Sequence, residues 1–343
     1  MYNIPYHGEQ DLSNLSFLVT GGAGFIGSNL VEYLLKFGAG KVRVLDNFST
    51  GDIKNLENFN LYTSFEIIEG DIRNMEDCKK AVEGIQIVFH EAALGSVPRS
   101  IEDPITTNDV NIKGFLNMLI AAKDAGVKRL VYAASSSTYG DSNDLPKVEN
   151  NIGRPLSPYA VTKYVNELYA DVFNRLYGLE YIGLRYFNVF GPKQKPDGAY
   201  AAVIPKFITS LIAHKEPTIN GDGKNSRDFT YIENVVQANI ISALTDKKMA
   251  VNQVYNVAYG EQTSLNELAI LLRDALATID PEIADVHFHY GKKRVGDIPH
   301  SLASISKAKH LLNYYPYFSI KDGLDETVKS YTEDYSKVAI PVF

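Results

Sequence analysis

The sequence contains no tryptophan and only one cysteine, Cys78. A disulfide within the chain is therefore impossible, and nothing around Cys78 resembles a catalytic thiol, so we expect a structural cysteine on a helix. No apolar run approaches the roughly 20 residues of a membrane-spanning helix. Residues 1–14 are polar and lack the apolar core of a signal peptide. These absences predict a soluble protein of a reducing, cytoplasmic compartment.

Positive charge is also scarce, with 34 Lys and Arg against 41 Asp and Glu, a formal net charge of −7. This balance argues against nucleic acid or an anionic membrane as the main partner. A phosphate-bearing ligand must then be held by local cationic groups. A metal-binding motif is also missing. His287 and His289 share one face of a predicted strand and could chelate a metal ion, but no third ligand accompanies them. We expect no metal site.

What the chain does contain is a regular alternation of short buried strands and helices. Predicted strands cover 15–20, 42–45, 65–69, 85–90, 130–134 and 181–185. Predicted helices between them cover 27–36, 75–82, 105–125 and 158–176. Such alternation is typical of the α/β class, here a doubly wound Rossmann-type parallel sheet with helices on both faces.

The pattern changes after Gly191, where Gly and Pro become frequent and the strands become short. One further buried run, 254–257, predicts a strand that returns to the main sheet. A length of 343 residues suits two domains. We predict a larger domain over 14–189, to which 233–260 returns, and a smaller α/β domain made of 190–232 and 261–343.

A glycine-rich turn follows the first predicted strand and opens the first helix, with Gly21, Gly24 and Gly27 in the spacing GxxGxxG. Glycine permits the positive φ and the close approach that a pyrophosphate on a helix N-terminus requires. Asp46 ends the next strand, where a carboxylate bonds ribose hydroxyls and repels a 2′-phosphate. This context predicts NAD rather than NADP as the cofactor.

Tyr159 and Lys163 lie four residues apart, on one face of the helix 158–176. A nearby ammonium, together with the positive nicotinamide ring, favours the phenolate and lowers a tyrosine pKa from about 10 toward neutrality. Tyr159 is therefore a candidate proton acceptor for a substrate hydroxyl. Ser135, Ser136 and Ser137 follow the strand 130–134, at the strand end where ligands bind in open α/β sheets. Their hydroxyls can hold the reacting oxygen.

With these motifs in this order, the chain resembles the extended short-chain dehydrogenase/reductase family from about Leu15 nearly to the C-terminus. Further matches are His-Glu-Ala-Ala at 90–93, Asn111, and the segments 185–192, 227–231 and 294–297. Within the family the chain is most similar to bacterial UDP-N-acetylglucosamine 4-epimerases, through the stretches 92–100 and 133–140. The smaller domain is then implied to bind the UDP-sugar.

Together with the motifs, the resemblance implies a catalytic set of Ser135, Tyr159 and Lys163. The implied cofactor site consists of Gly21, Gly24, Phe25, Ile26, Gly27, Asp46, Asn47, Phe48, Ser49, Thr50, Gly51, Asp71, Ile72, Ala92, Ala93, Tyr159, Lys163 and Tyr186. The implied substrate site consists of Ser96, Ser135, Ser136, Ser137, Tyr159, Asn188, Ala202, Val203, Asn220, Arg227, Arg294, Asp297 and Ser301. In it, Arg227 and Arg294 would neutralise the diphosphate, because arginine forks match phosphate oxygens, and Asp297 would accept from the uridine ribose.

The resemblance leaves several reactions open, all of which begin with hydride transfer from C4 of the sugar to NAD. Dehydratases and decarboxylases of the family carry acidic residues where this chain has Ser136, Ser137 and Thr138. Without those carboxylates the 4-keto sugar takes the hydride back on its other face. This implies interconversion of UDP-GlcNAc and UDP-GalNAc, which supplies precursors of surface polysaccharides.

Three alternatives stay open. A 4-epimerase of a UDP-hexuronic acid, or of its N-acetylated form, is compatible with the sequence, because Arg99 or a lysine near the pocket could receive a carboxylate. A UDP-sugar dehydratase ranks lower for want of the acidic residues. A non-catalytic NAD sensor also ranks lower, because such proteins usually lose the Tyr/Lys pair.

Substrate choice and assembly are also implied by the resemblance. Ser301 would wall the pocket beside the C2 substituent, where a tyrosine admits only a hydroxyl and a small residue leaves room for an acetamido group. Alternatively, Ser301 only caps a helix over 303–312. The helices 105–125 and 158–176 are implied to form the four-helix bundle of a homodimer.

Overall fold

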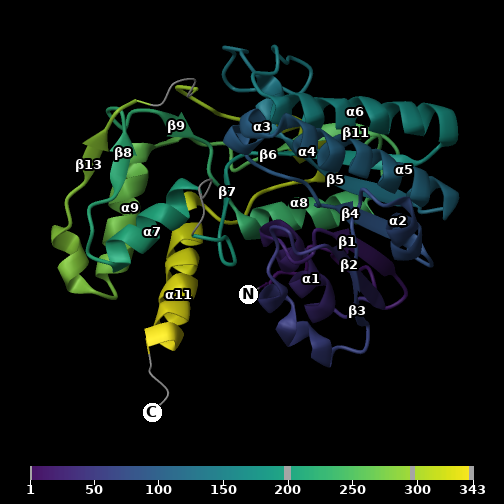
Figure 1. Ribbon diagram of the computed structural model, residues 1–343, viewed down its shortest axis with the longest axis horizontal. Coiled ribbons are helices and arrows are strands. Elements are labelled where there is room, and N and C mark those ends of the chain that lie inside the picture. The colour runs from purple at the N-terminus through teal and green to yellow at the C-terminus, as the bar shows by residue number, and fades with distance from the viewer. Residues whose placement is uncertain (1, 197–201, 294–297, 340–343) are drawn as a thin grey trace.

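The computed structural model describes residues 2–196, 202–293 and 298–339. Its centre is a seven-stranded sheet in the order β11-β6-β5-β4-β1-β2-β3, in which every neighbouring pair is parallel (Figure 1). The strands are β1 (Ser16–Thr20), β2 (Lys41–Asp46), β3 (Phe65–Glu69), β4 (Ile87–His90), β5 (Arg129–Ser135), β6 (Glu180–Tyr186) and β11 (Gln253–Val257). The predicted strands are confirmed, with small differences at their ends, and the run 254–257 joins the sheet beside β6.

Helices cover both faces of this sheet because successive strand residues point to opposite sides. On β1, Phe17 and Val19 pack into one hydrophobic cluster, with α1 (Phe25–Lys36) and α8 (Ile232–Leu244). Leu18 packs into the other cluster, with α2, α5 and α6. The helices of that second face are α2 (Met75–Val82), α5 (Gly114–Asp124) and α6 (Pro158–Tyr177). The strand order reverses between β1 and β4, which is where ligands bind in doubly wound sheets.

The predicted helix 105–125 is not one regular helix. It consists of α4 (Pro104–Asn108), a π-helical turn (Asp109–Lys113) and α5. The π-helical turn carries the buried Asn111, whose amide accepts from the Leu94 N–H at 2.8 Å and donates to the Thr162 hydroxyl at 3.1 Å. Asn111 thus ties the loop after β4 to α6. The spacing of apolar residues in the sequence cannot reveal this wider π-helical turn, because the apolar face of the helix continues through it.

A second group of elements lies beside the sheet, on the left of Figure 1. Its helices are α7 (Val203–Ile212) and α9 (Leu265–Ala277), and its short strands are β8 (Thr218–Asn220), β9 (Ser226–Arg227), β12 (Thr263–Ser264) and β13 (His289–Gly291). β7 (Val189–Phe190) pairs with β10 (Thr230–Tyr231) where the two groups meet. The chain ends in α10 (Ser306–Leu312) and α11 (Ile320–Ala339), and α3 (Val97–Glu102) lies near α4. The predicted helix start at 303 is wrong, because α10 begins at Ser306.

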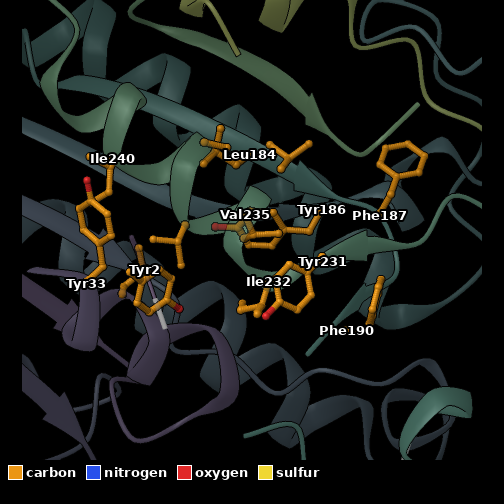
Figure 2. Packing of buried hydrophobic residues seen from close by; sticks show 14 of the residues in the cluster. Tyr2, Tyr33, Leu184, Tyr186, Phe187, Phe190, Tyr231, Ile232, Val235 and Ile240 are labelled. Atoms are coloured by element: carbon orange, nitrogen blue, oxygen red, sulfur yellow. The ribbon is translucent and has the colours of Figure 1, made fainter. Parts of the chain in front are cut away.

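The core continues from the sheet into the N-terminal segment, as Figure 2 shows. Ile232 and Val235 of α8 pack there with Tyr186 of β6 and with Tyr2. The Tyr2 hydroxyl donates to the Asn29 amide at 2.7 Å, so the first residues are fixed against α1. This packing holds α8 and β6 in place behind the candidate site.

Cys78 is fully buried in α2, and its thiol donates to the Ile72 carbonyl. Burial raises the pKa of this thiol to about 12, which confirms a structural cysteine. Among the described residues, no three His, Cys, Asp or Glu side chains are grouped so that they could hold a metal ion, and His287 lies outside β13. No helix in the described ranges is long and apolar enough to span a bilayer.

Candidate active site

A cavity of about 550 Å³ lies at the carboxyl ends of the central strands. It extends from the turn after β1 to the start of α6, and its volume is in the range typical of ligand and cofactor sites. All the residues predicted to hold the cofactor line this cavity except Phe48. The structure therefore brings together segments that are far apart in the sequence.

The glycine turn forms one end of this cavity. Gly21 has φ +67°, and a Cβ there would meet the Ala92 backbone at 2.8 Å. A Cβ on Gly27 would meet the Gly21 carbonyl oxygen at 2.2 Å, so α1 can pack this closely on β1 only with glycine. No side chain caps the N-terminus of α1, and Gly24 and Phe25 face the cavity there. The exposed helix amides suit a diphosphate.

Asp46 is buried at the end of β2 and lines the same cavity. One carboxylate oxygen accepts from the Ala23 N–H at 2.9 Å and the other from the Phe48 N–H at 2.8 Å. These bonds fix the carboxylate beside the glycine turn. Phe48 itself, at φ +56°, shapes this turn without lining the cavity.

Asp71 lies across the cavity from the catalytic end and accepts from Asn47 and Arg73. The Arg73 guanidinium lowers the pKa of this carboxyl to about 2. Asp71 is not the cap of α2, because Asn74 occupies that position.

The three predicted catalytic side chains meet at the other end of the cavity. Ser135 is the last residue of β5, and α6 begins at Pro158, with the Ser157 hydroxyl accepting from the Ala160 N–H as its cap. Tyr159 and Lys163 therefore face β5 from the first turns of α6. The Lys163 ammonium donates to the Ala133 carbonyl at 2.7 Å and lies 5.9 Å from the Tyr159 ring centre.

Burial is the main influence on the ionisation of this pair. It raises the pKa of Tyr159, a hydrogen bond with Ser135 opposes the rise, and a neighbouring charge on Glu91 adds to it. Burial also lowers the pKa of Lys163 to about 8. The predicted lowering of the Tyr159 pKa includes the positive charge of the nicotinamide ring, so it stays a prediction.

Among the lining residues to which the sequence analysis gave no role are the charged residues Arg73, Glu91, Lys193 and Lys195. The Lys193 ammonium pairs with Glu32 at 2.7 Å, and the Lys195 ammonium donates to the Thr50 carbonyl at 3.1 Å. Both lysines come from the loop after β7 and reach across to the α1 side. The Gly and Pro residues of this loop indicated a turn in the sequence, but they could not show that the chain after it runs toward α1.

A second cavity of about 540 Å³ is lined mainly by the second group of elements. Asn188 lines both cavities, so the two adjoin at this residue. Val203, Asn220 and Arg227 line the second cavity as predicted for substrate residues, together with Lys206. Ala202 precedes Val203 as the uncapped N-terminal residue of α7.

Of the other predicted substrate residues, Ser96, Ser136, Ser137 and Ser301 line neither cavity. Ser96 caps α3, and Ser136 and Ser137 form a short turn in which the Ser137 hydroxyl lies 2.9 Å from that of Ser135. The Ser301 N–H donates to the Ser226 carbonyl at 3.1 Å, directly beside Arg227. Ser301 is not a helix cap, because the cap position of α10 is Ile305. Arg294 and Asp297 lie outside the described residues.

A model of the NAD dependent epimerase/dehydratase family matches residues 17–258, a range that holds the glycine turn and all three predicted catalytic residues. The chain belongs to this family. It is therefore an NAD-dependent enzyme with a Rossmann-type fold, as the resemblance implied.

The relatives that match nearly the whole length of the chain are named for different UDP-sugars. A UDP-glucuronate 4-epimerase of Thermodesulfobacterium geofontis is 36% identical, over 91% of this chain and 94% of its own. The structure of a UDP-N-acetylglucosamine 4-epimerase from Methanobrevibacter ruminantium, in complex with UDP-N-acetylmuramic acid, has a TM-score of 0.84 and 40% identity, covering 93% and 99%. The structure of a UDP-glucose 4-epimerase from Thermotoga maritima with UDP-glucose has a TM-score of 0.86 and 34% sequence identity. This match covers 94% of this chain and 100% of that one.

Proposed function

We propose that this enzyme is a 4-epimerase that interconverts UDP-GlcNAc and UDP-GalNAc. The observation that carries the proposal is the convergence of Ser135, Tyr159 and Lys163 in one cavity, which adjoins a second, cation-bearing cavity at Asn188. A bound UDP-sugar would place its sugar at this convergence and its diphosphate toward Arg227. Lys206 adds a second cationic group there.

The residues present fit NAD. The uncapped amides of α1 suit the diphosphate, and Asp46 is fixed where it meets ribose hydroxyls and repels a 2′-phosphate. Glu91 contributes a buried carboxylate oxygen that has no hydrogen-bond partner within the described ranges. NAD, when bound, supplies a hydride acceptor that returns the hydride to the same carbon.

The chain's own residues manage the proton. Tyr159 lies where it can take the proton of the C4 hydroxyl and give it back, and Ser135 holds the same oxygen through its hydroxyl. The Lys163 ammonium, held by the Ala133 carbonyl, stabilises the phenolate as it forms. Positioning of these three groups is the chemical contribution of β5 and α6.

A dehydratase outcome is less well supported. Elimination of water needs an additional acid and base, and the turn after β5 offers only the hydroxyls of Ser136, Ser137 and Thr138. The keto sugar therefore has no carboxylate from this turn to abstract or deliver a proton. Return of the hydride is the simpler outcome, and 4-epimerisation is the net reaction.

The N-acetylated substrate is supported by Ser301 and by the similarity to the Methanobrevibacter enzyme. The Ser301 N–H is bonded to the carbonyl of Ser226 on β9, next to Arg227, which lines the second cavity, so a larger side chain at 301 would be introduced close to that cavity. A UDP-hexuronic acid is the second candidate, because a relative of similar identity is named a UDP-glucuronate 4-epimerase. For an N-acetylated substrate, supply of polysaccharide precursors is the corresponding role.

We also propose a homodimer formed through α6. Val161, Leu168, Val172 and Leu176 are exposed along one side of this helix, at 45%, 51%, 36% and 67%. Their spacing of seven and four residues makes a continuous apolar stripe. A second copy of α6 with its neighbouring helix would cover it.

The test is a panel of substrates. Purified protein is incubated separately with UDP-GlcNAc, UDP-Glc and UDP-GlcA, and the products are separated by chromatography. We expect UDP-GalNAc to form fastest. Preferred conversion of UDP-GlcA would replace the substrate assignment, and a 4-keto-6-deoxy product would replace the reaction.

A further inference from the structure

Glu91 is a carboxyl group in the catalytic cavity to which the proton transfer described above gives no role. It follows β4 directly and lines the cavity together with Tyr159 and Lys163. One of its oxygens accepts from the Tyr186 hydroxyl at 2.8 Å. The other oxygen is buried and has no hydrogen-bond partner in the described part of the chain.

The group that holds Glu91 is itself rigid. Tyr186 is buried at the end of β6, and its hydroxyl also accepts from the Asn239 amide of α8 at 2.9 Å. Glu91, Tyr186 and Asn239 therefore form a chain of hydrogen bonds from the core to the cavity. A carboxylate held this firmly in a poorly solvated site acts strongly on neighbouring charges.

Three titratable groups line the same cavity as Glu91: Tyr159 and Lys163 of α6, and Tyr186 of β6, which donates to it. A negative charge on Glu91 stabilises the Lys163 ammonium and opposes the Tyr159 phenolate. Burial raises the pKa of Glu91 to about 7, so this charge changes near neutral pH.

We propose that Glu91 is a positioning residue for proton transfer, whose carboxyl group, held by Tyr186 and aimed into the cavity, controls the ionisation of the Tyr159–Lys163 pair. When Glu91 is neutral, the phenolate of Tyr159 forms more readily. When Glu91 is charged, Lys163 keeps its proton and Tyr159 also retains its own. This inference rests on the proposed function only for its effect on turnover.

The first test is a titration of Tyr159 in the NAD-loaded enzyme. Because the chain contains no tryptophan, its near-ultraviolet absorbance reports tyrosinate. Subtracting the curve of Tyr159→Phe isolates the signal of Tyr159. In Glu91→Gln, which keeps the acceptor for Tyr186 but removes the charge, we expect the Tyr159 midpoint to fall by about one pH unit.

Two variants control this test. Glu66→Gln makes the same chemical change on β3, at a carboxylate paired with Arg43, and should leave the Tyr159 midpoint where it is in the wild type. Glu91→Asp retains the charge and should keep the midpoint above that of Glu91→Gln. An unchanged midpoint in Glu91→Gln would overturn the proposal and leave Glu91 as a structural acceptor for Tyr186.

A second measurement does not depend on any change at Glu91. The Glu91 carboxyl is followed by NMR of carbon-labelled glutamate in the wild type and in Lys163→Met. Since the coupling is reciprocal, loss of the Lys163 charge should raise the Glu91 midpoint. No response would contradict the coupling. Neither titration requires sugar turnover, so failure of the proposed reaction would be seen separately, in the substrate panel.

Discussion

Tyr159 combines burial with a position in the first turn of α6, directly opposite the end of β5. Its hydroxyl is the only part that a phenylalanine would lack. Replacing Tyr159 with Phe should lower kcat by about 10²–10⁴-fold, the usual contribution of general acid–base catalysis, while UDP-sugar binding persists. Steady-state kinetics and calorimetry measure the two quantities.

Tyr164→Phe is the matched control, because Tyr164 lies on the same helix but does not line the cavity. It should retain wild-type turnover. Near-normal kcat in Tyr159→Phe would remove Tyr159 from its assigned role.

Ser301 is the residue on which substrate selection depends in this account. Its backbone is held on β9 by Ser226, and His300 is held by the same residue, with its Nδ1 2.8 Å from the Ser226 hydroxyl. A larger side chain at 301 therefore cannot move away easily. Ser301→Tyr should cost N-acetylated substrates about 1–3 kcal/mol or more of transition-state binding and spare UDP-Glc and UDP-Gal.

The measurement is kcat/KM for UDP-GlcNAc and UDP-Glc with the wild type and with Ser301→Tyr. Ser304→Tyr is the control, since Ser304 follows on the same segment without contacting β9. Equal losses for both substrates in Ser301→Tyr would show that the residue is only structural.

At the residue scale, sequence reasoning located groups whose signal is local. The glycine spacing, the strand-end Asp46 and the Tyr159/Lys163 pair could each be read within a few residues. Glu91 and Lys195 could not, because their roles depend on which distant segment they meet. Glu91 belongs to the His-Glu-Ala-Ala motif at 90–93, but only the fold shows that the Tyr186 hydroxyl donates to it.

At the scale of elements, the buried strands were predictable because parallel strands read as continuous apolar runs. The two-residue strands β7, β9, β10 and β12 were not predictable, since so short a run shows no alternation of apolar and polar residues. The π-helical turn before α5 and the start of α10 were also missed. Both depend on tertiary hydrogen bonds, such as those of Asn111, rather than on propensity.

The apolar stripe on α6 gives the prediction at this scale. Leu168→Glu places a charge at its centre and should convert a dimer into a monomer, because a buried unpaired carboxylate is costly. Light scattering at micromolar concentration measures the mass. Ile270→Glu on α9, 45% exposed and in the second group of elements, should leave the dimer intact. A wild-type monomer would contradict the assembly.

For the whole molecule, the first cavity is lined by segments from the glycine turn to the loop after β7, and it adjoins the second cavity at Asn188. A cofactor contacted by this many segments should dissociate slowly. We expect NAD to co-purify, and denaturation followed by chromatography of the released nucleotide identifies it. Recovery of NADP, or no nucleotide together with no affinity for NAD, would count against the roles given to Asp46 and the glycine turn.

The most direct test of the central claim, inversion at C4 by removal and return of one hydride, uses UDP-GlcNAc deuterated at C4. The purified enzyme is incubated with this substrate in ordinary water, and the product is analysed by NMR and mass spectrometry. The account predicts UDP-GalNAc that still carries deuterium at C4, with no net reduction of NAD. Loss of the label to solvent, or accumulation of a keto sugar in place of UDP-GalNAc, would contradict it.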